Sequence, residues 1–335
     1  MAIAMSRTTL RRLVGVALLL AGFATHLLAG FFTQELIAEA AIFAIFALSL
    51  DLLATCGLVS FGHAGLLGVG AYVFAGATVK LGLAPGLAML VAVGGGALAA
   101  CLVGLLILRT SGAYFIMVTL AAAEMLYAWA FLSRTFNGGD GMGGIPRLDL
   151  SGIGIDLATP GTFAVLALVV CAAVWLVLEM VLTSPYGRTL DAVRQNPSRV
   201  AALGGRVFAY RLSALTLSGA IAALAGALKV QHTNFVSPDL VSWFVSGDVL
   251  IAVVVGGIGT LVGGMLGAAL LVLLKDVLSS SVGYWYLFLG VIFIVVALAM
   301  PNGIVGSLLA WFERRRAKRA DGEAAAIEPP EKVPT

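Results

Sequence analysis

Ten apolar runs account for most of this sequence, and most of them are as long as a membrane-crossing helix. A bilayer core of about 30 Å is crossed by a helix of about 20 residues. The candidate spans are residues 13–32, 35–56, 58–80, 86–108, 112–134, 161–183, 208–231, 246–257, 261–278 and 284–301. The runs are continuous rather than alternating, which favours helices over a closed barrel. The sequence therefore predicts an all-α polytopic membrane protein with about 8–10 membrane segments.

The composition excludes an ordinary soluble domain. Hydrophobic residues make up 61% of the chain and charged residues 11%, against about 25% charged in soluble domains. The net charge of +3 does not suggest nucleic-acid binding, because the basic residues lie where membrane topology requires them. Cys56, Cys101 and Cys171 lie in apolar segments without metal-ligand spacing, so we expect buried free thiols and no metal or cofactor.

The eighth run is too short to cross a bilayer unaided. It is followed by Gly256-Gly257-Ile258-Gly259, which predicts a broken or re-entrant helix covered by protein or lining a cavity. The segments 57–72 and 256–267 resemble each other, since both space their glycines in small-xxx-small patterns. This similarity fits repeated broken helices beside a transport pathway. Small residues at ordinary helix contacts would produce it as well.

The distribution of positive charge predicts the orientation of the chain. With both termini in the cytoplasm, fifteen of the twenty Lys and Arg residues lie on the cytoplasmic side, as membrane proteins prefer. The five exceptions are Lys80, Arg134, Arg147, Lys229 and Lys275. Lys229 and Lys275 are expected near outer helix ends, as interfacial anchors or as attractors of an anionic group. A charged tail, 313–335, follows the transmembrane domain 1–312 and is expected to be disordered.

A basic segment, residues 184–211, interrupts the apolar runs and is predicted to project into the cytoplasm. Its arginines are Arg188, Arg194, Arg199, Arg206 and Arg211. Pro185 predicts the start of one short helix, and Asn196-Pro197 ends it and starts a second that stops at Gly204. The apolar side of these helices is expected to consist of Leu190, Val193, Val200 and Leu203. Such an element offers a contact for a soluble partner.

Glycine is concentrated in residues 135–160, which should form an outer loop. Dense glycine lets backbone approach a partner or ligand closely. A flexible hairpin that only connects two helices would have the same composition.

No motif indicates an enzyme. The sequence lacks a phosphate-binding loop, an HExxH motif and a GxSxG elbow. Ionisable residues predicted inside spans are costly and usually face a partner or cavity; they are Asp51, His63, Glu124 and Glu179. Asp51 and His63 could form an ion pair. Glu124 could line a pathway or make a structural hydrogen bond, and Glu179 is expected to reach water at the interface.

Four segments together identify a family resemblance. Residues 49–72, 137–146, 184–204 and 253–268 resemble the permease family of bacterial branched-chain amino-acid ABC importers, and the layout is similar to its M-type subunit. The resemblance runs from about residue 35 to 308 in consistent order. It implies a bacterial cytoplasmic (inner) membrane location, a second permease subunit, two ABC ATPase subunits and an external substrate-binding protein. ATP hydrolysis would then occur on the partners.

Within that resemblance, the basic segment would contact the ATPase. The residues assigned to this contact are Arg188, Leu190, Arg194, Asn196, Pro197 and Gly204. The residues assigned to the substrate pathway are Ser60, Phe61, His63, Tyr72, Glu124, Gly256 and Gly257. Because this set has no cluster of fixed charge, it suits a small solute with an apolar side, such as a branched-chain amino acid.

Two alternatives remain open at this point. Members of the family also carry urea, short amides and small carboxylates. The rival class is an ion-coupled secondary transporter or channel in which Asp51, His63 and Glu124 form an ion route.

Overall fold

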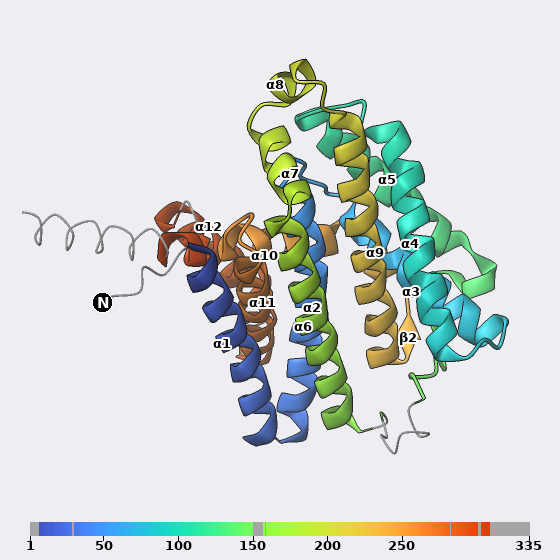
Figure 1. Cartoon of the computed structure of the whole chain (residues 1–335). Helices are drawn as coiled ribbons and strands as arrows, with labels where there is room; N and C mark the ends of the chain where they lie inside the picture. Colours follow the sequence, from blue (N-terminus) through green and yellow to red (C-terminus); the bar gives the residue numbers. More distant parts are fainter. Residues whose placement is uncertain are drawn as a thin grey trace, which may run out of the picture.

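The computed structural model describes residues 7–28, 30–149, 157, 159–281, 283–300 and 303–308, so the predicted tail 313–335 lies outside the described residues. Helices make up most of this part, with almost no strand, which confirms the all-α prediction (Figure 1). The helices are α1 (Arg7–Leu28), α2 (Phe31–Ala54), α3 (His63–Ala75), α4 (Pro85–Ile107), α5 (Ala113–Leu132), α6 (Pro160–Thr183), α7 (Pro185–Gln195), α8 (Pro197–Ala202), α9 (Val207–Thr233), α10 (Trp243–Gly256), α11 (Val262–Ser281) and α12 (Trp285–Ala299).

In the described part of the chain, six helices are long and apolar enough to cross a membrane: α2, α4, α5, α6, α9 and α11. Shorter apolar helices are Arg12–His26, Trp243–Gly256 and Trp285–Val296. The predicted break after the eighth run is present, because α10 ends at Gly256 and α11 begins at Val262.

The third predicted span, 58–80, differs from the structure at its start. The helix begins only at His63, and a five-residue π-helical turn, Gly76–Lys80, follows it. Before His63 the backbone leaves α2 and is bound by α5, where Thr119 Oγ1 accepts a hydrogen bond from the Phe61 amide at 3.3 Å. Gly62 approaches so closely that a Cβ there would lie 2.2 Å from the Thr119 carbonyl oxygen. This contact replaces the first turn of the expected helix.

α2 and α9 form the centre of the bundle, and they are the most buried of the six long helices. α9 packs against α3 and α4 through small residues. A Cβ at Gly70 of α3 would lie 2.1 Å from the Ala223 carbonyl oxygen, and one at Gly226 of α9 would lie 2.0 Å from that of Leu67. Close backbone approach of this kind is how helices associate in membranes, where apolar side chains gain little by leaving lipid.

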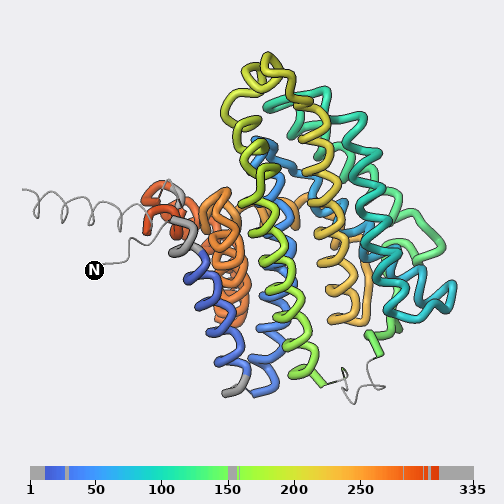
Figure 2. The backbone as a smooth tube through the Cα atoms, in the orientation of Figure 1, coloured from blue at the N-terminus to red at the C-terminus, as the bar shows by residue number. Residues whose placement is uncertain are grey.

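The two ends of the bundle carry different elements (Figure 2). One end, from which the short helices α7 and α8 extend, is called the α7–α8 end (Figure 1). The opposite end, here the β end, carries strands β1 (Met142–Gly143) and β2 (Phe235–Val236). These strands pair antiparallel and attach the glycine-rich segment to the end of α9. The described part of that segment is therefore packed against the bundle; residues 150–156 lie outside the described residues.

Two sequence expectations about charged residues were wrong. Glu179 does not reach water: it is buried and accepts a hydrogen bond from Arg12 Nε of α1 at 3.2 Å. His63 does not pair with Asp51, because its Nε2 lies 2.7 Å from Ser49 Oγ and 3.3 Å from Ser218 Oγ. Hydropathy and helix spacing carry no information about partners that are distant in the sequence.

Candidate coupling element and translocation residues

α7 and α8 form a helical pair whose ends match the local sequence signals. Ser184 caps α7 by accepting a hydrogen bond from the Gly187 amide. Asn196 caps α8, with its Oδ1 2.9 Å from the Arg199 amide nitrogen and 2.8 Å from Ser198 Oγ. Gly204, just beyond α8, has a φ of +84°, which glycine adopts without strain.

α7 is packed against the bundle, whereas α8 projects from it (Figure 1). Leu190 and Val193 are fully buried, as the apolar pattern predicts. Leu203 differs from that pattern, because it follows the end of α8 and is 84% exposed. The apolar side chain of Leu203 is therefore accessible to another protein.

The junction between α6 and α7 is sterically fixed. A Cβ at Gly187 would lie 2.3 Å from the Leu182 carbonyl oxygen, so only glycine fits this corner. Tyr186 OH lies 2.7 Å from Ser213 Oγ of α9. Burial raises the pKa of Tyr186, which favours the protonated hydroxyl in this hydrogen bond. α7 is therefore joined to α6 by this corner and to α9 by this hydrogen bond.

The residues assigned to the pathway lie at several places rather than in one cavity. His63 is completely buried between α2 and α9, with its ring stacked on Phe46 at 5.5 Å between centroids. Ser60 lines a cavity of about 30 Å³ beside α5, which has room for only a few water molecules. Tyr72 is buried against Phe136 in an edge-on arrangement. Phe61 is half-buried next to Ser60.

Glu124 differs from the other assigned residues because it is exposed. It lies near the middle of α5, and its carboxylate has no ion pair or hydrogen bond within the part of the chain that the structure describes. The neighbouring exposed residues of α5 are Tyr114, Met117, Met125 and Trp129. An ionised carboxylate at mid-membrane costs about 2.5–3.5 kcal/mol on insertion scales. Protein or water is therefore a more favourable neighbour for this face of α5 than lipid.

Gly256 and Gly257 lie at the break between α10 and α11, close to α7. Asp51 of α2 holds this break: its carboxylate accepts hydrogen bonds from the amides of Gly259 at 2.5 Å and Leu261 at 2.7 Å. The first turn of α3 is held in a reciprocal way, since Ser246 Oγ of α10 accepts a hydrogen bond from the Ala64 amide at 2.9 Å. Each broken segment is thus capped by the helix that precedes the other.

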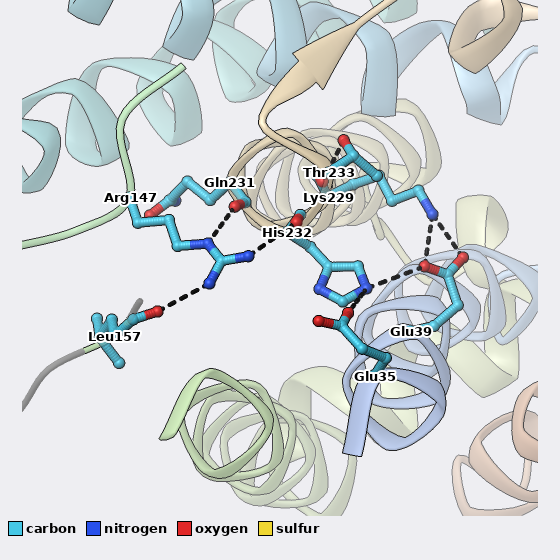
Figure 3. Close-up of polar contacts among 8 residues, drawn as sticks. All are labelled: Glu35, Glu39, Arg147, Leu157, Lys229, Gln231, His232 and Thr233. Atoms are coloured by element: carbon cyan, nitrogen blue, oxygen red, sulfur yellow. Dashed lines mark hydrogen bonds and ion pairs between the residues drawn. The ribbon is translucent and has the colours of Figure 1, made fainter. Parts of the chain in front are cut away.

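A polar cluster lies at the β end, where it joins the end of α9 to its neighbours (Figure 3). Arg147 donates to the carbonyl oxygens of Gln231 at 3.0 Å, His232 at 3.2 Å and Leu157 at 2.9 Å. It thereby binds the last carbonyls of α9, where a positive charge is favourable.

In the same cluster, two carboxylates of α2 face α9 (Figure 3). Glu39 forms an ion pair with Lys229, and His232 Nε2 lies 3.3 Å from Glu35 Oε2. The cluster joins α2, α9 and the glycine-rich segment.

Sequence reasoning missed the acidic partners of the membrane lysines. Glu39 binds Lys229, and Asp248 of α10 binds Lys275 of α11. A signal was available, because a lysine inside an apolar span requires an acid on a neighbouring span. Among the described residues, no group of three or more His, Cys, Asp or Glu side chains is arranged so that it could hold a metal ion.

The bundle, its capped breaks and the projecting helical pair form a polytopic membrane protein, as the resemblance implies. The chain belongs to the family described as branched-chain amino acid transport system / permease component, whose model matches residues 32–297.

Relatives within and beyond that description are similar over most of the chain. The chain is 28% identical over 321 residues to the high-affinity branched-chain amino acid transport system permease protein LivM of Escherichia coli K12, covering 89% of this chain and 76% of the relative. To LivM of Salmonella typhimurium it is 28% identical over 271 residues, covering 74% of this chain and 64% of that relative. It is 31% identical over 243 residues to the fructose import permease protein FrcC of Rhizobium meliloti, covering 68% of this chain and 65% of the relative. No solved structure matches the chain.

Proposed function

We propose that this chain is the membrane-spanning permease subunit of an ATP-binding-cassette importer for branched-chain or related hydrophobic amino acids. Membership of the permease family and the similarity to two LivM proteins support this proposal. ATP hydrolysis occurs on two separate ABC ATPase subunits, and an external binding protein delivers the solute. The chain itself supplies the path and no enzymatic activity.

The observation that carries the proposal is the projecting pair α7–α8. A capped, basic helical element with an exposed apolar tip at Leu203 has the form of a docking site for a soluble protein. Its base is fixed to α6 and α9 by Gly187 and by Tyr186. Closure of the ATPase subunits therefore tilts α6 and α9, and the opening of the path alternates between the two sides.

A second permease subunit, similar or identical to this chain, covers the exposed face of α5. The carboxylate of Glu124 supports this assignment, because lipid is an unfavourable surrounding for it. The solute path then runs between the two subunits, with Glu124 beside it. The cavity next to Ser60 is too small for an amino acid, which is consistent with a path that two subunits build together.

The substrate class follows from the relatives and from the weakly charged character of the assigned pathway residues. A solute with an apolar side chain needs few fixed charges around it. The chain is similar to a fructose import permease, and the family also includes carriers of urea and amides. Because related permeases serve such different solutes, the binding protein is the main selector of the solute.

The proposal places the chain in the bacterial cytoplasmic membrane, with residues 1–312 as the permease domain and both termini in the cytoplasm. Cysteines introduced at Asp140 and Ser198 test this topology. Both positions are exposed, and they lie at opposite ends of the bundle, Asp140 just before β1 and Ser198 in α8. In intact cells an impermeant maleimide should label Asp140→Cys and spare Ser198→Cys. The reverse pattern would overturn the orientation.

The functional test uses the complete transporter in proteoliposomes. Replacement of both Arg188 and Arg194 by Glu should leave the permease inserted but remove leucine-stimulated ATP hydrolysis and uptake. Replacement of Arg134 at the β end serves as the control, and uptake should persist in that variant. If urea or fructose is taken up and stimulates ATP hydrolysis, whereas leucine does neither, the amino-acid substrate is excluded. Uptake by this chain alone, without an ATPase, would favour a secondary transporter.

A further inference from the structure

The break between α10 and α11 lies beside α7, and the two enclose a cavity of about 330 Å³ at the α7–α8 end. α7 contributes Arg188, Asp191 and Arg194 to its wall, and the turn contributes Ile258 and Gly259. The glycines at and after the end of α10, within residues 256–259, therefore lie next to the proposed docking element, α7–α8. We refer to residues 257–261 as the α10–α11 turn.

The α10–α11 turn is held by the surrounding structure, although Ile258 at its tip is exposed. Asp51 is completely buried and accepts hydrogen bonds from two amides of the turn, those of Gly259 and Leu261. Leu261 has a φ of +55°, a left-handed conformation that is costly for leucine and persists only where the surroundings enforce it. Gly303 supports the turn from behind, since a Cβ there would lie 2.5 Å from the Cα of Gly257.

Two side chains facing this cavity lack partners that their chemistry would favour. Ile258, at the tip of the turn, is 49% exposed. Arg188 is exposed and has no ion pair within the described ranges, whereas Arg194 is paired with Asp191 at 2.7 Å. A rigid apolar tip beside an unpaired guanidinium fits a protein segment that presents an apolar side chain next to a carboxylate.

We propose that the α10–α11 turn is a second docking site for the ATPase subunit, and that the cavity between the turn and α7 receives a projecting acidic and apolar segment of that subunit. This inference rests on the proposed function. Continuity supports it, because α7 forms one wall of the cavity and also the base of the projecting pair. Asp51 acts as a positioning residue, and through it the ATPase acts on α2 as well as on α6 and α9.

The test is site-specific photo-cross-linking in the complete transporter, co-expressed with its ATPase and second permease. A benzophenone amino acid is placed at Ile258, at Leu203 on the α8 tip, or at Leu81, which is 73% exposed and distant from α7. After irradiation, adducts with the ATPase subunit are detected by immunoblotting. Positions 258 and 203 should both give the adduct, and position 81 should not.

The outcomes separate this inference from the function on which it rests. An adduct at position 203 without one at 258 overturns the second docking site and leaves the proposed function intact. The absence of the adduct at both positions overturns both. Binding measurements give an independent result: Ile258→Asp should weaken binding of the ATPase subunit to the permease about tenfold, whereas Ile258→Leu should not. Equal binding by Ile258→Asp and the unaltered chain would also overturn the inference.

Discussion

Gly226 of α9 offers a quantitative test of how closely the central helices pack. A Cβ at this position would lie 2.0 Å from the Leu67 carbonyl oxygen of α3, whereas ordinary contact begins at 3.4 Å. In Gly226→Ala the two helices must therefore separate by about 1.4 Å, and a gap of even 0.5–1 Å loses about a quarter to a half of the dispersion attraction. Overpacking against backbone costs about 3 kcal/mol, and the better helix propensity of alanine offsets about 1 kcal/mol.

The net destabilisation of about 2 kcal/mol should lower Tm by about 3 °C, given the unfolding entropy expected for a chain of 335 residues. Tryptophan fluorescence of the detergent-solubilised chain during heating measures this shift. Gly94→Ala is the matched control, because it lies in the apolar helix α4 with nothing within 4 Å of the added methyl group. That substitution should leave Tm unchanged or raise it slightly. If Gly226→Ala melts at the temperature of the unaltered chain, or if Gly94→Ala is equally damaging, the close-packing argument is refuted.

Three further predictions follow from single contacts. Burial raises the pKa of the Cys56 thiol to about 11, so this thiol is protonated at pH 8. It should react with N-ethylmaleimide only after unfolding, which mass spectrometry of its peptide would measure. Rapid labelling of the folded chain would contradict this prediction. Gly187→Ala should tilt α7 and lower uptake per ATP hydrolysed while the ATPase stays bound, and unchanged coupling would show that the corner is tolerant. Glu39→Gln alone should destabilise the chain more than Glu39→Gln combined with Lys229→Met, because the single variant leaves Lys229 without its partner. A double-mutant cycle should give a coupling free energy of about 0.5–3 kcal/mol, and strict additivity would exclude the ion pair.

Features that depend on local chemistry could be predicted from the sequence. Pro185 and Asn196-Pro197 set the ends of α7 and α8, because proline lacks an amide hydrogen and asparagine caps the next helix with its own oxygen. The end of α10 at Gly256 was predicted in the same way. Long apolar runs located the long helices to within a few residues.

Features that depend on distant partners could not be predicted. Arg12 and Glu179 are 167 residues apart, and nothing in either segment identifies the other. The non-helical backbone before His63 lies inside an apolar run, and hydropathy does not report backbone conformation. For the candidate site, the sequence predicted the helical pair α7–α8. It did not predict the hydrogen bonds between Asp51 and the α10–α11 turn, because these residues are about 210 positions apart and meet only in the folded bundle.

The reciprocal capping of the two broken segments also constrains how the protein is made. The Ala64 amide of α3 can form its hydrogen bond to Ser246 only after the ribosome has added the 182 residues that separate them. At about 5–20 residues per second, synthesis of that stretch takes about 10–40 s. During this interval α3 is in the membrane with an unsatisfied amide near its first turn. The first half of the chain is therefore an unfinished insertion intermediate, and two separately expressed halves would mature only where both reach the same membrane.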